Sequence, residues 1–181
     1  FRTSHEIQKI EAWDYKDLAE MVDMDAVKKF KAESLNPNRA CQLGSAQNPD
    51  IFFQVREACN TVYDELPAVV EEYMNKVNEK IGTNYGLFNY YGAPDAEHVI
   101  IAMGSVCETA EEAIDFLNAN GGRFGIVKVR LYRPFSAKHL IDAIPASVKK
   151  ISVLDRTKEP GALGEPLYLD VVAALHESQF K

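Results

Sequence analysis

Short apolar runs alternate with helical patterns in the second half of the chain. Apolar runs at residues 98–103, 124–131 and 149–154 predict buried strands, and an aromatic run at residues 85–91 predicts a fourth. Strands that alternate with helices form mostly parallel sheets, and right-handed crossovers place the helices on both faces. The pattern therefore predicts a three-layer α/β/α domain.

Three helices are expected within this domain. They cover residues 105–120, 137–144 and 166–175, where apolar residues recur at helical spacing. Ser105 and Glu108 have the S-x-x-E spacing of a capping box, which predicts that their side chains close the start of the first helix.

A helical extension precedes the domain. Asp14 is a candidate N-cap for a helical pattern that continues to residue 35, and Asn48 followed by Pro49 marks a second helix start. From there to residue 81 the pattern allows one bent helix or two helices that meet near Asn60. Pro67 either interrupts this stretch or sits in the first turn of the second helix. Apolar positions along the stretch favour association of the chain in solution.

Composition, net charge and the length of the apolar runs limit the classes of partner that the chain can have. The chain has 181 residues, of which 46% are apolar and 26% charged, as expected for a globular domain with an extension. A net charge of −7 without a basic cluster argues against nucleic acid or an anionic membrane surface as a partner. No apolar run approaches the roughly 20 residues that span a bilayer. We therefore expect neither a nucleic-acid nor a membrane partner.

The cysteines and the first residue carry further information. Cys41, Cys59 and Cys107 are widely spaced, so this chain alone has no CxxC pair for a zinc ribbon or an iron–sulfur cluster. Scattered cysteines in odd number indicate reduced thiols and a cytoplasmic protein. The chain begins with Phe1 instead of methionine, and we expect it to be a piece of a longer polypeptide.

Two glycine-containing loops after predicted strands are candidates for an anion site. Gly104 and Ser105 directly precede a helix, whose free N–H groups and dipole favour a phosphate. Gly161 and Gly164 lie in the loop after the last predicted strand, where glycine lets a ligand approach the backbone. Neither loop has the GxGxxG or Walker spacing. Structural turns without a ligand are therefore the favoured interpretation.

The charged and titratable residues do not form a complete active site by their spacing. Arg133, Arg156 and Lys158 stand at predicted strand ends, where they suit an anion-binding rim, a docking surface or, more simply, a solvated surface. The four histidines lack metal-ligand spacing, and no nucleophile motif is present. A polar cluster at the start of the chain could bind an anion or line a cleft; it comprises Arg2, Thr3, Ser4, His5 and Glu6. We predict no metal site and no catalytic residue in this segment.

Longer runs of sequence resemble a known family. These runs, in order, are FRTSHEIQKI, AQNPDIFFQVREA, YYGAPDAEHVIIAMGSVCET, VKVRLYRPFS and LDRTKEPGALGEPLYLDV. They closely resemble the pyruvate:ferredoxin (flavodoxin) oxidoreductases, and the resemblance extends over essentially the whole chain. Runs of this length are far more specific than any short motif.

The resemblance implies a large parent enzyme. Members of the family are cytoplasmic homodimers that use thiamine diphosphate, magnesium and [4Fe–4S] clusters. They convert pyruvate and coenzyme A to acetyl-CoA and CO2 and pass electrons to ferredoxin or flavodoxin. Ferredoxin or flavodoxin and the remaining domains of the polypeptide are therefore the implied partners.

The resemblance also implies a domain division. Residues 1–50 correspond to the tail of the domain that binds the thiamine pyrimidine, 51–82 to a helical connector, and 83–181 to a domain like the C-terminal domain of transketolases. Such domains have a mostly parallel sheet with one antiparallel edge strand, for which residues 85–91 are the candidate.

The family's cofactor and cluster motifs cannot be mapped onto this chain. The resemblance therefore implies a structural, assembly-supporting segment that binds no cofactor and is inactive alone, with the residues from Arg2 to Glu6 nearest to the parent's active site. Two alternatives stay open: an autonomous phosphate- or nucleotide-binding α/β module, and a subunit-interaction domain.

Overall fold

The computed structural model describes residues 7, 10–40 and 44–178, and the chain forms two compact units. Unit 1 comprises Phe1–Asn60 and Lys76–Thr83, and unit 2 comprises Thr61–Asn75 and Asn84–Lys181. The long helix α4, Asn60–Ile81, contributes residues to both units.

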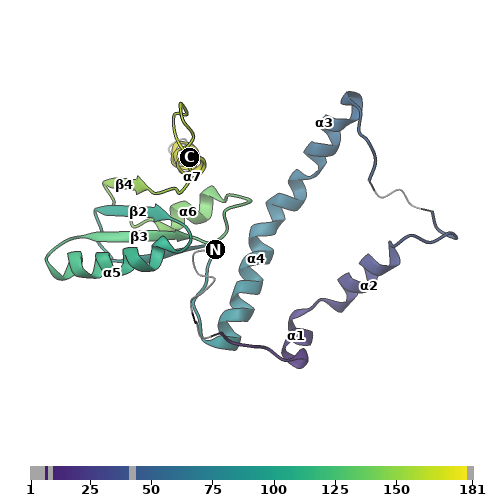
Figure 1. Ribbon diagram of the computed structural model, residues 1–181, viewed down its shortest axis with the longest axis horizontal. Helices are drawn as coiled ribbons and strands as arrows, with labels where there is room; N and C mark the ends of the chain where they lie inside the picture. The colour runs from purple at the N-terminus through teal and green to yellow at the C-terminus, as the bar shows by residue number, and fades with distance from the viewer. Residues whose placement is uncertain (1–6, 8–9, 41–43, 179–181) are drawn as a thin grey trace. The chain divides into compact units, whose positions relative to one another are not determined.

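Unit 2 contains a four-stranded sheet (Figure 1). Its strands are β1 (Phe88–Gly92), β2 (His98–Ala102), β3 (Phe124–Val129) and β4 (Lys150–Val153), in the spatial order β1-β3-β2-β4. Strand β2 pairs in parallel with β3 and with β4, whereas β1 pairs antiparallel with β3. The predicted mixed sheet with one antiparallel edge strand is therefore confirmed.

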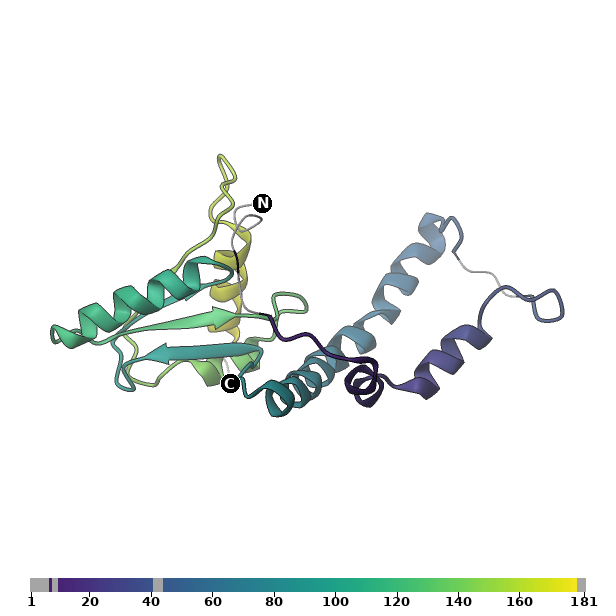
Figure 2. The same ribbon diagram turned by 60° about the horizontal axis from the view of Figure 1, so that its bottom comes forward.

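Helices cover both faces of this sheet (Figures 1 and 2). One face is covered by α5 (Val106–Ala119), which buries Cys107 and Ile114 against Ile126 of β3. The other face is covered by α6 (Ala137–Ala143) and α7 (Pro166–Ser178). The predicted three-layer architecture is confirmed.

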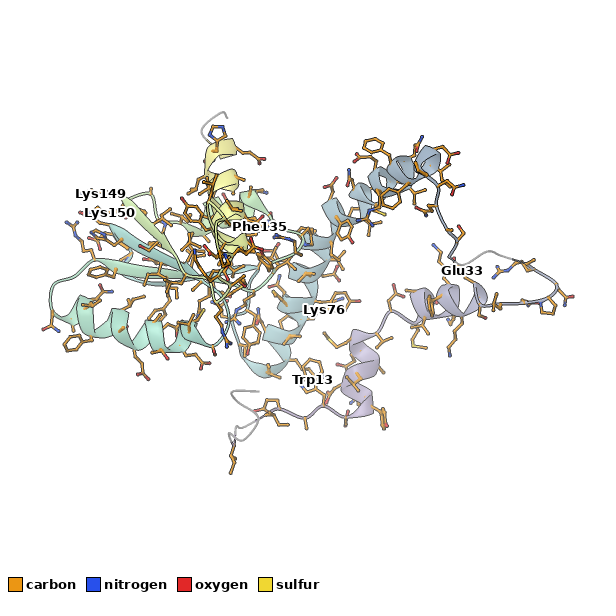
Figure 3. The ribbon with its side chains drawn as sticks, turned by 45° about the horizontal axis from the view of Figure 1, so that its top comes forward. Trp13, Glu33, Lys76, Phe135, Lys149 and Lys150 are labelled. Atoms are coloured by element: carbon orange, nitrogen blue, oxygen red, sulfur yellow. The ribbon has the colours of Figure 1, made fainter. Side chains whose placement is uncertain are left out.

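The larger of the two cores lies on the α6 and α7 face. Leu140 of α6 and Leu167 of α7 are fully buried there, and Val70 and Met74 of α4 pack against the same cluster. Phe135 packs edge-on against Phe88, with the ring centroids 5.6 Å apart (Figure 3). At the amino end of β4, by contrast, Lys149 and Lys150 point outward (Figure 3).

The edge strand begins later than the aromatic run suggests. β1 starts at Phe88 and not at residue 85, because the side chain of Asn89 binds the backbone before it. The N–H of Gly86 donates to Asn89 Oδ1 and Asn89 Nδ2 donates to the carbonyl of Asn84, both at 2.9 Å. These bonds engage the backbone of Asn84 and Gly86, and regular pairing with β3 begins at Phe88.

The extension consists of α1 (Tyr15–Met21), α2 (Met24–Ala32), α3 (Pro49–Ala58) and the beginning of α4. Asp14 is the N-cap of α1, as expected, but the helical pattern that follows is divided in two. The division occurs because Asp23 accepts the N–H groups of Asp25 and Ala26 and so caps α2.

The two-helix arrangement is the correct one for residues 49–81. Helices α3 and α4 meet at Cys59, and Pro67 lies in the interior of α4. It does not lie in a first turn. A proline at this position removes one backbone hydrogen bond of the helix.

Unit 1 has little packing of its own. None of its described residues is buried. Lys80 links α4 to α1, because its Nζ lies 2.5 Å from Asp17 and 2.9 Å from Glu20. These hydrogen bonds, Asp17 first, raise the pKa of Lys80. The ion pairs are partly exposed, so they position α1 more than they stabilise the unit.

Candidate functional site

The candidate residues of the α/β domain gather at the carboxyl edge of the parallel strands. Because β2, β3 and β4 are parallel, the loops that follow them start at the same edge of the sheet. The chain leaves β2 toward α5 on one face, but leaves β3 and β4 toward helices on the other face. Such a divergence is where open α/β sheets bind ligands.

The loop after β2 holds Gly104 and Ser105, both exposed. Gly104 has φ +79°, which glycine adopts without strain. The expected capping box of Ser105 and Glu108 is wrong: Ser105 has helical backbone angles and its side chain makes no cap hydrogen bond. The N–H of Cys107 donates to the carbonyl of Gly104 at 3.1 Å, so a backbone turn replaces the side-chain cap.

The loop after β4 is fixed by Asp155. Its two carboxylate oxygens accept the N–H of Thr157 at 3.1 Å and the N–H of Leu167, in the first turn of α7, at 3.0 Å. These two hydrogen bonds, Thr157 first, lower the pKa of Asp155. The carboxylate thus neutralises the positive end of the α7 dipole from within the domain.

A second carboxylate closes the same loop. Glu165 accepts from Lys158 Nζ at 3.1 Å and from the N–H of Glu159 at 3.2 Å. The bond from Lys158 is the larger cause of the lowered pKa of Glu165. Lys158, expected on an anion-binding rim, is therefore paired within the loop.

The two glycines of this loop differ in their surroundings. Gly161 is exposed and has φ +85°. Gly164 is buried, and a Cβ there would lie 2.2 Å from Cδ1 of Tyr168. The absence of a side chain at Gly164 therefore lets the loop close on the Tyr168 ring. Beside them the loop forms a hollow of about 470 Å³, lined by Val153, Leu154, Asp155, Arg156, Thr157, Lys158, Leu163, Gly164, Glu165 and Tyr168.

The loop after β3 holds Arg133, the other residue expected on an anion-binding rim. Its guanidinium lies 2.8 Å from Asp170 of α7 and stacks 4.0 Å from the centre of the Tyr132 ring. Burial is the main cause of a raised pKa of Tyr132. Arg133 thus joins its loop to α7.

The structure brings only some of the candidates together. Arg156, Lys158 and Gly164 line one hollow, whereas Gly104 and Ser105 do not line it. The candidates Arg2, Thr3, Ser4, His5 and Glu6 lie outside the described residues. The anion site at Gly104, Ser105, Gly161 and Gly164 stays a prediction.

Sequence reasoning missed Asp155 and Asp170 as the residues that organise this edge. Asp155 caps α7, which starts eleven residues later along the chain. It does so by accepting the N–H of Leu167, twelve positions away. The partner of Asp170 belongs to another loop. Local capping rules cannot find such distant pairs. The only signal was the position of Asp155 at the end of a strand.

Two histidines of the α/β domain contact neighbouring side chains. The His98 ring stacks on Phe124, and His139 Nδ1 lies 2.6 Å from Ser136 Oγ, so both make structural contacts. Among the described residues, no three His, Cys, Asp or Glu side chains are grouped so that they could hold a metal ion. No helix in the described part of the chain is long and apolar enough to cross a membrane.

Two family models match the chain in tandem and define its class. Residues 1–75 match the model described as pyruvate flavodoxin/ferredoxin oxidoreductase, thiamine diP-binding. Residues 96–181 match the model described as pyruvate:ferredoxin oxidoreductase core domain II. The class is thus that of the oxidoreductases that share these two domains.

Individual relatives match the whole chain. The pyruvate-flavodoxin oxidoreductase of Enterobacter agglomerans is 59% identical over all 181 residues, and the pyruvate:ferredoxin oxidoreductase of Moorella thermoacetica is 55% identical over 98% of the chain. A solved 2-oxoglutarate:ferredoxin oxidoreductase from Magnetococcus marinus is 25% identical, covers 48% of this chain and 15% of its own, and has a TM-score of 0.32.

The chain belongs to the pyruvate:ferredoxin (flavodoxin) oxidoreductase family, as the sequence resemblance indicated. It spans about 15% of the length of the curated relatives it matches.

Proposed function

We propose that this chain is a supporting segment of a pyruvate:ferredoxin (flavodoxin) oxidoreductase. The parent enzyme converts pyruvate and coenzyme A to acetyl-CoA and CO2 and passes the electrons to ferredoxin or flavodoxin. The observation that carries the proposal is the match to relatives from end to end of the chain, at 59% identity, over only 15% of their length. On this view the segment supports its neighbouring domains and other parts supply the chemistry.

The cofactors of the parent are thiamine diphosphate, magnesium and [4Fe–4S] clusters. The described residues do not fit the magnesium ion, because they offer no group of three acidic or other ligating side chains. The sequence has no CxxC pair for a cluster. We therefore assign no reaction step to the described residues.

The proposal also assigns each part of the chain to a part of the parent enzyme. Residues 1–50 end the thiamine domain, with Arg2, Thr3, Ser4, His5 and Glu6 nearest to the parent's active site. Residues 51–82 connect this domain to the α/β domain of residues 83–181. The parent acts in the cytoplasm as a homodimer.

The proposal is tested by exchanging the segment. We expect a full-length Enterobacter agglomerans enzyme that carries this segment in place of its own to reduce flavodoxin with pyruvate and coenzyme A at a rate close to that of the parent. The 181-residue chain alone should show no such activity, and neither thiamine diphosphate, coenzyme A nor nucleotides should raise its melting temperature.

Three outcomes contradict the proposal. They are activity of the chain alone, a folded but inactive exchanged enzyme, and saturable stabilisation of the chain by a nucleotide. The last result would favour an autonomous nucleotide-binding module.

A further inference from the structure

Helix α3 presents an apolar face to solvent. At 100° per residue, Ile51, Phe52 and Val55 fall within an arc about 100° wide, while Asp50, Glu57 and other polar residues occupy much of the rest. These three side chains are 46%, 52% and 40% exposed. We call them the α3 apolar face.

The exposure of this face contrasts with the burial of the corresponding face of α5 in unit 2. In unit 2, α5 has a similar amphipathic pattern and buries Cys107 and Ile114 to 6% and 2% exposure. In unit 1 no described residue is buried. A helix of ten residues gains most of its stability from burying such a face. The α3 apolar face is therefore built to be covered.

We infer that the α3 apolar face docks on the rest of the thiamine-binding domain of the same polypeptide. This inference rests on the proposed function. The thiamine-binding family model includes all of α3, because it matches residues 1–75. The relatives extend far beyond the segment, which is 15% of their length. The occupant is thus an apolar surface of that domain, joined to α3 through the chain.

The size of the face favours this occupant over a second copy of the chain. Three half-exposed side chains offer on the order of 300 Å². A stable interface between separate proteins buries about 800 Å² on each partner. Docking within one polypeptide needs less area, because the covalent link removes most of the entropic cost of association.

Two matched variants test the inference in the exchanged full-length enzyme. Phe52→Ser removes the largest side chain of the face. Phe53→Ser makes the same change at the next residue, which is 70% exposed and lies outside the arc. We expect amide hydrogen exchange of residues 50–59 to be slower in the full-length enzyme than in the 181-residue chain, by on the order of 100-fold. Phe52→Ser should abolish most of this protection, and Phe53→Ser should leave it.

Equal effects of the two variants, or exchange as fast in the enzyme as in the chain, would overturn the inference. Protection that disappears on dilution would assign the face to a second copy, and would overturn it too. An active enzyme with an unprotected α3 refutes the docking alone. A folded, inactive enzyme with a protected α3 refutes only the proposed function.

Discussion

Single carboxylates start three of the helices in this chain. Asp14 and Asp23 each accept two backbone N–H groups at the start of α1 and α2. Asp155 accepts one N–H group of α7, that of Leu167, and a second from Thr157 in the loop that precedes the helix. The first two were open to prediction, because a cap residue next to its helix is a local signal in the sequence. Asp155 was not, because only the folded domain brings it to Leu167.

Replacement of Asp155 by alanine should destabilise unit 2 by about 1 kcal/mol, the usual cost of losing an N-cap side chain. Urea unfolding followed by far-UV circular dichroism measures this. Asp142→Ala, on the exposed side of α6, is the control and should have little effect. Equal stability of the Asp155 variant and the unchanged chain would refute the capping role.

The same carboxylate predicts a pH dependence. Its hydrogen bonds lower its pKa below the ordinary value of 3.8, so the folded state binds its proton less readily than the unfolded state. The stabilisation is therefore complete above that value and is lost as the pH falls through the lower folded-state pKa. The stability difference between the unchanged chain and Asp155→Ala should shrink over this acidic range. A difference that grows there contradicts the assignment.

At the scale of elements, the period and the length of the apolar patterns predicted most of the strands and helices. The apolar and aromatic runs predicted all four strands, and β2 and β3 are largely buried, as strands that read as continuous apolar segments should be. The expected burial of β4 is wrong, because exposed and half-buried residues alternate along it. The predicted start of a strand was wrong where a side chain bonds to the backbone, as the side chain of Asn89 does before β1. The Ser105 cap failed because Gly104 turns the chain with its own carbonyl. The hollow beside β4 depends on Gly164 lying against Tyr168, which no local pattern reveals.

The pairing of β1 with β3 predicts a sharp difference between two glycines. Gly92 (φ +127°) lies opposite Gly125, and a Cβ there would lie 2.5 Å from the carbonyl oxygen of Phe124. Gly121 also has positive φ, but a Cβ there meets nothing within 4 Å. Gly92→Ala should therefore lower the free energy of unfolding about 1–3 kcal/mol more than Gly121→Ala. Equal losses in urea titrations would show that the close approach is not what constrains Gly92.

At the scale of the whole molecule, the two units differ in what holds them together. Unit 2 has two buried clusters, whereas no described residue of unit 1 is buried. In the 181-residue chain, Trp13, its single tryptophan, lies in unit 1. Its fluorescence should therefore change at lower urea concentration than the circular dichroism signal of unit 2.

A variant in unit 2 separates the two signals. Leu140→Ala removes a fully buried side chain and should cost unit 2 about 2–5 kcal/mol. We expect it to shift the circular dichroism transition and to leave the early fluorescence change in place. Coincident transitions in both proteins would mean that the chain unfolds as one cooperative body.

The sharing of α4 affects where this polypeptide can be cut. The two family matches leave residues 76–95 between them, and these residues include β1. A protein that begins at residue 96 would lose β1, together with Val70 and Met74, which pack against the larger core. The edge of β3 would then be unpaired, and an open strand edge recruits other chains. Borders drawn by sequence similarity would thus yield an aggregating product, whereas a border near residue 60 keeps β1 paired with β3.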